Sequence, residues 1–286
     1  MLPSRARLAW GLFLCVILGL CGNLLSRSEP GEEHHLQQPA LPVVQEPGLA
    51  ASRTSGAEPP ETSWREFPPS TRRVREGDAS VPPWCSTVGT PGASGSLTAE
   101  EREMLASYYT GSIEVFEWGA GASSLLAQSC GVQRITTVDT VAGAIACVLS
   151  KGLASLGQAY TGLHVQVHGD QGSFGNPVDE GARAAWPDVS GAIFLHPAPH
   201  HVDVALVDGR FRAASIFKAA SVLRGDAVIL VHDWDREAYH AGEREGVLRL
   251  LQQRGRLAAL QRTEKGGALT QEAWAALWSA VEFSPT

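Results

Sequence analysis

The amino-acid sequence predicts an α/β fold built on a doubly wound, mostly parallel sheet of about seven strands. Two observations carry this prediction. Short runs rich in branched apolar residues alternate with helix-compatible segments from residue 113 to residue 260, which is typical of consecutive βαβ units. A glycine-rich turn at residues 117–123 joins the first strand of the series to its first helix. We expect residues 84–286 to form one folded domain.

The first βαβ unit is the clearest part of the pattern. The run Ile113–Phe116 has the apolar character of a buried strand, and the turn Glu117–Ser123 follows it directly. Ser124–Cys130 is compatible with a helix, and Arg134–Val138 forms the next strand, which ends at Asp139. A turn of this kind lets a polar or anionic ligand approach backbone N–H groups at a helix N-terminus.

Carboxylates on both sides of this turn indicate what kind of ligand it binds. Asp139 follows Glu117 by 139 − 117 = 22 residues, near the ~20-residue spacing at which a carboxylate meets ribose hydroxyls. A dinucleotide site has a third glycine where this sequence has Ser124, and Glu117 would repel a pyrophosphate. The turn therefore predicts an adenosine-type cofactor that carries positive charge.

Strands and helices continue to alternate around this unit. A capping box at Thr98–Glu101 predicts a helix before the first strand. After Asp139 we expect a helix over Val141–Leu153, strands over Leu163–Val167 and Asp203–Val207, a helix over Phe211–Leu223 and a strand over Ala227–Val231. The tail is expected to add a helix over Val247–Leu251, a strand over Leu257–Leu260 and a final helix through Trp274 and Leu277.

Carboxylates stand at the C-terminal ends of successive predicted strands. Any one of them has an ordinary explanation as a helix cap or turn residue. Ligands of open α/β sheets bind just beyond the carboxyl ends of the strands, so carboxylates in register favour one common site there. The residues are Glu117, Asp139, Asp170, Asp208 and Asp233.

Three further motifs extend the pattern: DQGSFGNP at residues 170–177, DVALVDGRFR at 203–212 and AVILVHDW at 227–234. With the E-x-G-x-G turn, they resemble the class I S-adenosylmethionine-dependent methyltransferases over about residues 97–234. The resemblance implies a Rossmann-like methyltransferase fold and S-adenosyl-L-methionine as the cofactor. The stretch 171–202 departs from the family's third-to-fourth-strand connection, and we expect it to shape the acceptor pocket.

The resemblance also implies roles for the residues that match its motifs. Asp208 would lie beneath the methyl donor. In the cofactor site, the turn of Glu117, Gly119, Gly121 and Ser123 would hold the methionine end, Asp139 the ribose and Asp170 the adenine amino group.

Catalytic candidates follow the fourth and fifth strands. His232 and Asp233, with Asp208, stand where a general base for methyl transfer to oxygen can work, and histidine titrates near neutrality. The alternative for His232 is a strand-end histidine with local hydrogen bonds. Arg210 and Arg212 are candidates to grip a carboxylate on the acceptor, or else solvated residues at a helix start.

The predicted activity is methylation of a hydroxyl or carboxylate on a small molecule or a glycan. Catechol-type methyltransferases bind a metal through carboxylates that match Asp208 and Asp233, but Trp234 replaces their usual Asn, so we expect no metal site. One alternative is a type II lumenal glycosyltransferase that uses Asp233 and Asp235 to hold a metal. Another is a methyltransferase-like binding module without catalysis.

The N-terminal part has a different composition. Arg5 and Arg7 precede the apolar run Leu8–Leu25, so residues 1–25 are expected to form a type II signal anchor or a cleaved signal peptide. Residues 26–83 are rich in Pro, Glu, Ser and Arg and predict a disordered stalk. These segments predict a single-pass type II membrane protein of the endoplasmic reticulum or Golgi, or a secreted protein after cleavage.

The net charge limits the expected binding partners, and the cysteine content limits the expected disulfides. A net charge of −7 gives no electrostatic basis for binding nucleic acid. The expected partners are the acceptor molecule and, through the N-terminal segment, the membrane. Outside the apolar run the cysteines are Cys85, Cys130 and Cys147. We expect buried free thiols, although one pair could close in an oxidising lumen.

Overall fold

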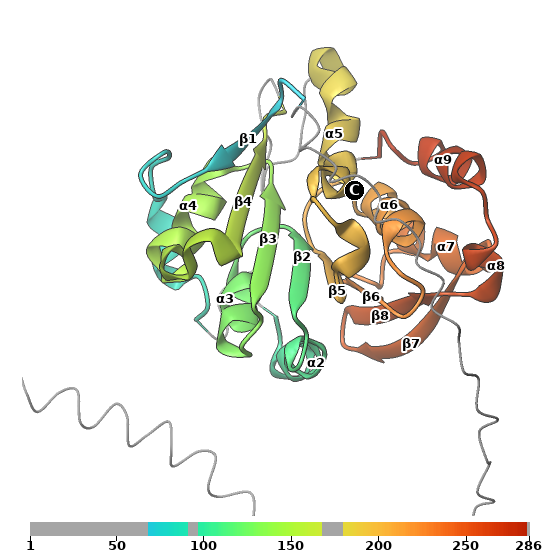
Figure 1. Ribbon diagram of the computed structural model, residues 1–286, viewed down its shortest axis with the longest axis horizontal. Coiled ribbons are helices and arrows are strands. Elements are labelled where there is room, and N and C mark those ends of the chain that lie inside the picture. The colour runs from blue at the N-terminus through green and yellow to red at the C-terminus, as the bar shows by residue number, and fades with distance from the viewer. Residues whose placement is uncertain (1–67, 91–96, 168–179, 285–286) are drawn as a thin grey trace, which may run out of the picture. The chain divides into compact units, whose positions relative to one another are not determined.

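A computed structural model describes residues 68–90, 97–167 and 180–284. The predicted anchor, most of the predicted stalk and Asp170 lie outside these ranges. One sheet of eight strands has the order β1-β4-β3-β2-β5-β6-β8-β7 (Figure 1). The strands are β1 Thr71–Val74, β2 Glu114–Trp118, β3 Arg134–Asp139, β4 Tyr160–Val165, β5 Val204–Val207, β6 Val228–Val231, β7 Leu248–Arg254 and β8 Leu257–Arg262.

The strand directions confirm a doubly wound, mostly parallel sheet. Neighbouring strands from β4 through β3, β2 and β5 to β6 are all parallel. β1 pairs antiparallel with β4, and β8 pairs antiparallel with both β6 and β7. The strand order reverses direction between β2 and β5, which is the switch point where α/β sheets bind ligands.

Helices cover both faces of the sheet (Figure 1). One core cluster contains side chains of α2, α3 and α4, and a second contains side chains of α5, α6 and α9. Within the described ranges, no helix is long and apolar enough to cross a bilayer. The helices are α2 Ala99–Tyr109, α3 Ala122–Ser129, α4 Ala142–Ser150, α5 Trp186–Gly191, α6 Arg212–Val222, α7 Ala241–Arg244, α8 Glu264–Gly267 and α9 Gln271–Ser279.

Short 3₁₀ helices fill the connections, at Pro83–Thr87, Leu153–Ala159, Glu180–Ala185, Ala192–Leu195, Pro199–His201 and Glu237–His240. Strand β2 lies at the centre and shows how the sequence separates the two cores. Successive side chains of a strand point to opposite faces. Val115 accordingly belongs to the cluster of α2, α3 and α4, whereas Phe116 and Trp118 belong to the other. The same alternation turns Glu117 toward α2 and α3.

One predicted element is wrong in type. Residues 247–251 were expected to be helical, but Leu248–Arg254 forms strand β7 at the edge of the sheet. The run VLRLL has apolar residues at spacings that suit either a helix or a half-buried strand. The hairpin to β8 decides between them, because Gly255 has a positive φ of 54° in its tight turn and Arg254 pairs with Leu257.

The folded domain also begins earlier than the predicted boundary at residue 84. Strand β1 lies inside the segment assigned to the stalk and adds an eighth strand. It has four residues, of which the two arginines are exposed and only Thr71 and Val74 are buried. So short a strand leaves little periodicity in the sequence, and its pairing with β4 supplies the order.

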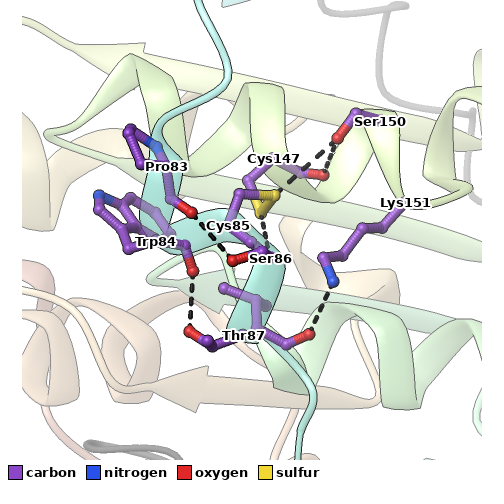
Figure 2. The surroundings of a disulfide bond; sticks show 9 residues. Pro83, Trp84, Cys85, Ser86, Thr87, Cys147, Ser150 and Lys151 are labelled. Carbon is purple, nitrogen blue, oxygen red and sulfur yellow. Dashed lines mark hydrogen bonds between the residues drawn. A yellow bond between two sulfur atoms is a disulfide. The ribbon is translucent and has the colours of Figure 1, made fainter.

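A disulfide corrects the expectation of free thiols. Cys85, in the short helix Pro83–Thr87, is bonded to Cys147 of α4, while Cys130 is free. Figure 2 shows the bond seated against α4, with the Lys151 ammonium reaching the chain just beyond Thr87. That ammonium donates to the carbonyl of Val88 at 3.0 Å. The disulfide therefore fastens the segment before α2 to the helix that follows β3.

Candidate functional site

The turns after β2 and β5 meet at the switch point. Gly119 has a φ of 104°, and a Cβ added there would lie 3.1 Å from the backbone carbon and oxygen of Asp208. A Cβ added to Gly209 would in turn lie 3.0 Å from the backbone carbon of Trp118. Gly119 is therefore required by its own conformation and by the close approach of the second turn.

Gly121 differs from Gly119 in both respects. Its φ of 179° is extended backbone that any residue can adopt. A Cβ added there would meet no atom within 4 Å, so the open side of the turn borders empty space. Gly121 leaves that space free for a ligand next to the start of α3.

Asp139 holds the glycine turn in place. Its Oδ2 accepts a hydrogen bond from the Ala120 N–H at 2.9 Å, and its Oδ1 accepts one from the Val141 N–H at 2.7 Å. Burial raises the pKa of Asp139 to about 6, although these bonds and the charge of Arg210 act to lower it. The Thr140 backbone contributes a further hydrogen bond to this carboxylate. The structure thus places Asp139 beside the turn, and its predicted contact with a ribose stays a prediction.

Glu117 is placed behind the turn and not on its open side. The side chain is fully buried, and its carboxylate accepts hydrogen bonds from the hydroxyls of Tyr109, at 2.6 Å, and Ser124. Ser123, also buried, contributes a further hydrogen bond. Burial raises the pKa of Glu117 to about 7, against the effect of these bonds. Glu117 therefore links α2 and α3 to the glycine turn.

We expect the buried Glu117 to make the protein less stable as pH rises. Its pKa is about 7 in the folded chain and near 4.5 when unfolded, so the folded state binds the proton more tightly. The unfolding free energy should fall between about pH 4.5 and 7, by on the order of 3 kcal/mol, and then level off. Glu117→Gln should remove this component. Urea unfolding of both proteins from pH 4.5 to 8 isolates it, and parallel curves would contradict the assignment.

His232, Asp208 and Asp233 form a single cluster, as predicted, but His232 faces inward. Its Nδ1 lies 3.0 Å from Asp208 Oδ1 and 3.6 Å from Asp233 Oδ1, and its side chain is only 5% exposed. Burial lowers the pKa of His232, but Asp208, Asp233 and Glu101 together raise it above 6.5. Asp208 is the accessible member, with a side chain 29% exposed.

Asp233 is enclosed by arginines. Its carboxylate pairs with Arg212 at 2.7 Å, Arg256 at 2.6 Å and Arg236 at 3.1 Å. Its φ of 56° is a left-handed conformation that is uncommon for residues other than glycine. Burial acts to raise the pKa of Asp233, but Arg212, His232 and Arg236 hold it below its usual value. Asp233 organises the cluster from inside and does not face a ligand.

The hypothesis that Arg210 and Arg212 grip an acceptor is wrong for Arg212. Arg212 is buried and occupied, since its guanidinium binds Asp208 and Asp233 and donates to the carbonyls of Gly209 and His232. It is not available to grip an acceptor. Arg210 lies near enough to Asp139 to lower the pKa of that carboxyl group. Arg210 thus lies on the Asp139 side of the cluster, and its predicted contact with an acceptor stays a prediction.

The glycosyltransferase alternative requires Asp233 and Asp235 to bind one metal ion together, but the two side chains lie in different environments. Asp233 is buried among arginines, whereas Asp235 is exposed. Trp234, between them, is buried with its ring stacked on His240 at a centroid distance of 4.2 Å. In the described part of the chain, no group of three or more His, Cys, Asp or Glu side chains could hold a metal ion.

Two residues of α2 belong to the cluster although sequence reasoning did not find them. Tyr109 binds Glu117, and Glu101 approaches His232 Nε2 to 3.6 Å. Glu101 was recognised only as part of a capping box, which the structure confirms. The helical spacing of α2 puts Glu101 and Tyr109 on its buried side. Because Glu is the ordinary third residue of a capping box, nothing in the sequence distinguished Glu101 as buried.

Comparison with solved structures gives the fold a name. A methyltransferase-like protein from Silicibacter pomeroyi aligns with a TM-score of 0.53 and 22% identity, over 67% of this chain and 97% of that one. The chain has a methyltransferase-like fold. The resemblance seen in the sequence motifs is thus confirmed for the fold.

Other solved structures resemble this methyltransferase-like fold more weakly. A TDP-rhamnose 3′-O-methyltransferase aligns with a TM-score of 0.36 and 16% identity, over 56% of this chain and 76% of that one. A mitomycin 7-O-methyltransferase gives 0.32 and 14%, over 57% and 53% of the two chains. At these scores neither alignment carries an argument. No protein-family model matches the chain, and no curated protein matches it.

Proposed function

We propose that this chain is an S-adenosylmethionine-dependent methyltransferase that methylates a hydroxyl or carboxylate oxygen on a small molecule or glycan. The observation that carries the proposal is the glycine turn after β2, with open space at Gly121 and the Asp139 carboxylate beside it. Cofactor binding at this end of the sheet is what the methyltransferase-like fold supports.

The residues of the turn suit this cofactor. Asp139 would accept hydrogen bonds from the ribose hydroxyls, and Gly121 would let the methionine end approach the backbone. Glu117, Ser123 and Ser124 would support the turn from behind. Asp170, outside the described residues, remains the proposed partner of the adenine amino group.

S-adenosylmethionine supplies a methyl group already activated by its sulfonium. The chain's own contribution would be alignment of the acceptor and removal of its proton. Asp208 is the proposed general base that accepts the acceptor's proton, because it is the most exposed carboxylate of the cluster and lies where the two turns meet. His232 and Asp233 would support Asp208 from within.

We also propose that the protein works in the secretory pathway, as a type II membrane protein or as a secreted form. The Cys85–Cys147 disulfide supports an oxidising compartment, because such bonds rarely persist in the cytosol. The apolar run at residues 8–25 supports membrane insertion.

The decisive experiment is calorimetry on the full chain with S-adenosylhomocysteine, the demethylated cofactor. We expect binding, and we expect Asp139→Asn to weaken it roughly ten- to a hundredfold, since charge-assisted hydrogen bonds contribute on the order of 1.5–3 kcal/mol. Asp226→Asn is the matched control. Asp226 is 75% exposed and precedes β6, at the opposite end of the strand from His232.

Thermal melting of both variants should accompany the titration, because Asp139 also holds the Ala120 N–H. Equal weakening by the two variants would contradict a specific role for Asp139. If the wild-type chain binds a UDP-sugar and not S-adenosylhomocysteine, the glycosyltransferase alternative replaces the proposal. If it binds neither, the methyltransferase proposal is wrong.

A further inference from the structure

Glu101 is a buried charge to which the proposed function gives no role. Its carboxylate is 1% exposed. Oε2 accepts the Thr98 N–H at 2.8 Å and Oε1 accepts the Arg256 N–H at 2.8 Å. Burial acts to raise the pKa of Glu101, but these bonds and His232 keep it below its usual value. The helix start therefore contains an ionised carboxylate that backbone donors hold in one position.

His232 is the cationic group that faces this carboxylate. Nε2 lies 3.6 Å from Glu101 Oε2, is buried and forms no hydrogen bond with the described part of the chain. Nδ1 is within hydrogen-bond distance of Asp208. If Nδ1–H donates to Asp208, a neutral ring would turn a bare lone pair toward Glu101. A second proton, on Nε2, replaces that repulsion with attraction.

We propose that Glu101 is a positioning residue of the active site: it holds the His232 imidazole in place, and the imidazole in turn holds the Asp208 carboxylate toward the acceptor. This inference rests on the proposed function. Glu101 does not touch the ligand and acts through the imidazole. The line Glu101–His232–Asp208 leads from the buried start of α2 to the accessible carboxylate where the two glycine turns meet.

The other charges near His232 lie on the Nδ1 side or on its backbone. Asp208 and Asp233 lie 3.0 Å and 3.6 Å from Nδ1. Arg212 of α6 donates to the His232 carbonyl and pairs with both aspartates, and Arg256 pairs with Asp233. Among the described residues, Glu101 is the one carboxylate within 4 Å of Nε2. Its charge can therefore be removed while the aspartates stay in place.

The test is an NMR titration of the imidazoles in the full chain, with the His232 signal assigned by its loss in His232→Gln. In the wild type, His232 should titrate above 6.5. Glu101→Gln should lower its pKa by about one unit or more, the usual effect of losing an opposite charge at this distance. Glu100→Gln removes an exposed charge from the same helical turn and should change little.

Two outcomes overturn the inference: a wild-type His232 that titrates below 6.5, or a shift in Glu101→Gln no larger than in Glu100→Gln. The wild-type titration decides even if Glu101→Gln fails to fold. S-adenosylhomocysteine calorimetry on the same samples separates the two proposals. Absence of binding to the wild type defeats the proposed function, whatever His232 does. Binding to the wild type with no shift in Glu101→Gln defeats only the role of Glu101.

Discussion

Gly119→Val is expected to destabilise the folded chain by about 2–6 kcal/mol at 25 °C. A β-branched residue at a φ of 104° is strained, at about 1–3 kcal/mol. Its Cβ would also press on the Asp208 backbone at 3.1 Å, which adds about 1–3 kcal/mol of overpacking. The combined cost is a large share of the ~5–15 kcal/mol that stabilises a typical domain. Urea unfolding followed by circular dichroism measures it.

Gly121→Ala provides the matched control for Gly119→Val. Its backbone is extended and a new Cβ meets nothing within 4 Å, so the urea midpoint should stay near that of the wild type. Binding of S-adenosylhomocysteine should nevertheless weaken if the ligand occupies the space beside Gly121. A Gly119→Val protein as stable as Gly121→Ala would contradict the close approach of the two turns.

Loss of the disulfide is the second large effect that we expect. The bond closes a loop of 62 residues in sequence separation, for which chain-entropy reasoning gives a stabilisation of up to about 4 kcal/mol. Cys85→Ser with Cys147→Ser should therefore lower the unfolding free energy by about 2–4 kcal/mol. Denaturant titration with and without dithiothreitol measures the change.

Reductant should bring the wild type to the stability of the double variant and leave the double variant itself unchanged. Cys130→Ser, which removes the free thiol, is the control and should respond to reductant as the wild type does. A wild type that is insensitive to reductant would contradict the Cys85–Cys147 bond. It would also withdraw the support that the disulfide gives to an oxidising compartment.

Local patterns in the sequence were enough to predict most of the parallel sheet. β3 begins at Arg134 as expected and β5 ends at Val207 as expected, because branched apolar runs between turn signals have few alternatives. β7 was misjudged because an exposed edge strand has no strict alternation, and Leu250 and Leu251 are both exposed. The disulfide could not be predicted from the sequence. The three cysteines outside the N-terminal apolar run allow three pairings, and only the fold brings Cys85 and Cys147 together.

The sequence predicted where the residues of the site lie in the fold, but not the directions in which their side chains point. Strand ends brought Asp139 to the turn and gathered Asp208, His232 and Asp233, as their places in the sequence indicated. Which carboxylate is accessible depends on side-chain direction and on partners distant in sequence. Glu117 points inward because it shares a face with Val115, and its partner Tyr109 comes from α2.

The strand order divides the sheet at the β2–β5 pair into two halves that are each continuous in the chain. β1 to β4 belong to the first half and β5 to β8 to the second. Asp139 stands in the first half and Asp208 in the second, with the Gly119 and Gly209 turns in contact across the boundary. A ligand that touches both turns would therefore stabilise the contact between the two halves, because separating the halves would also break the ligand's contacts.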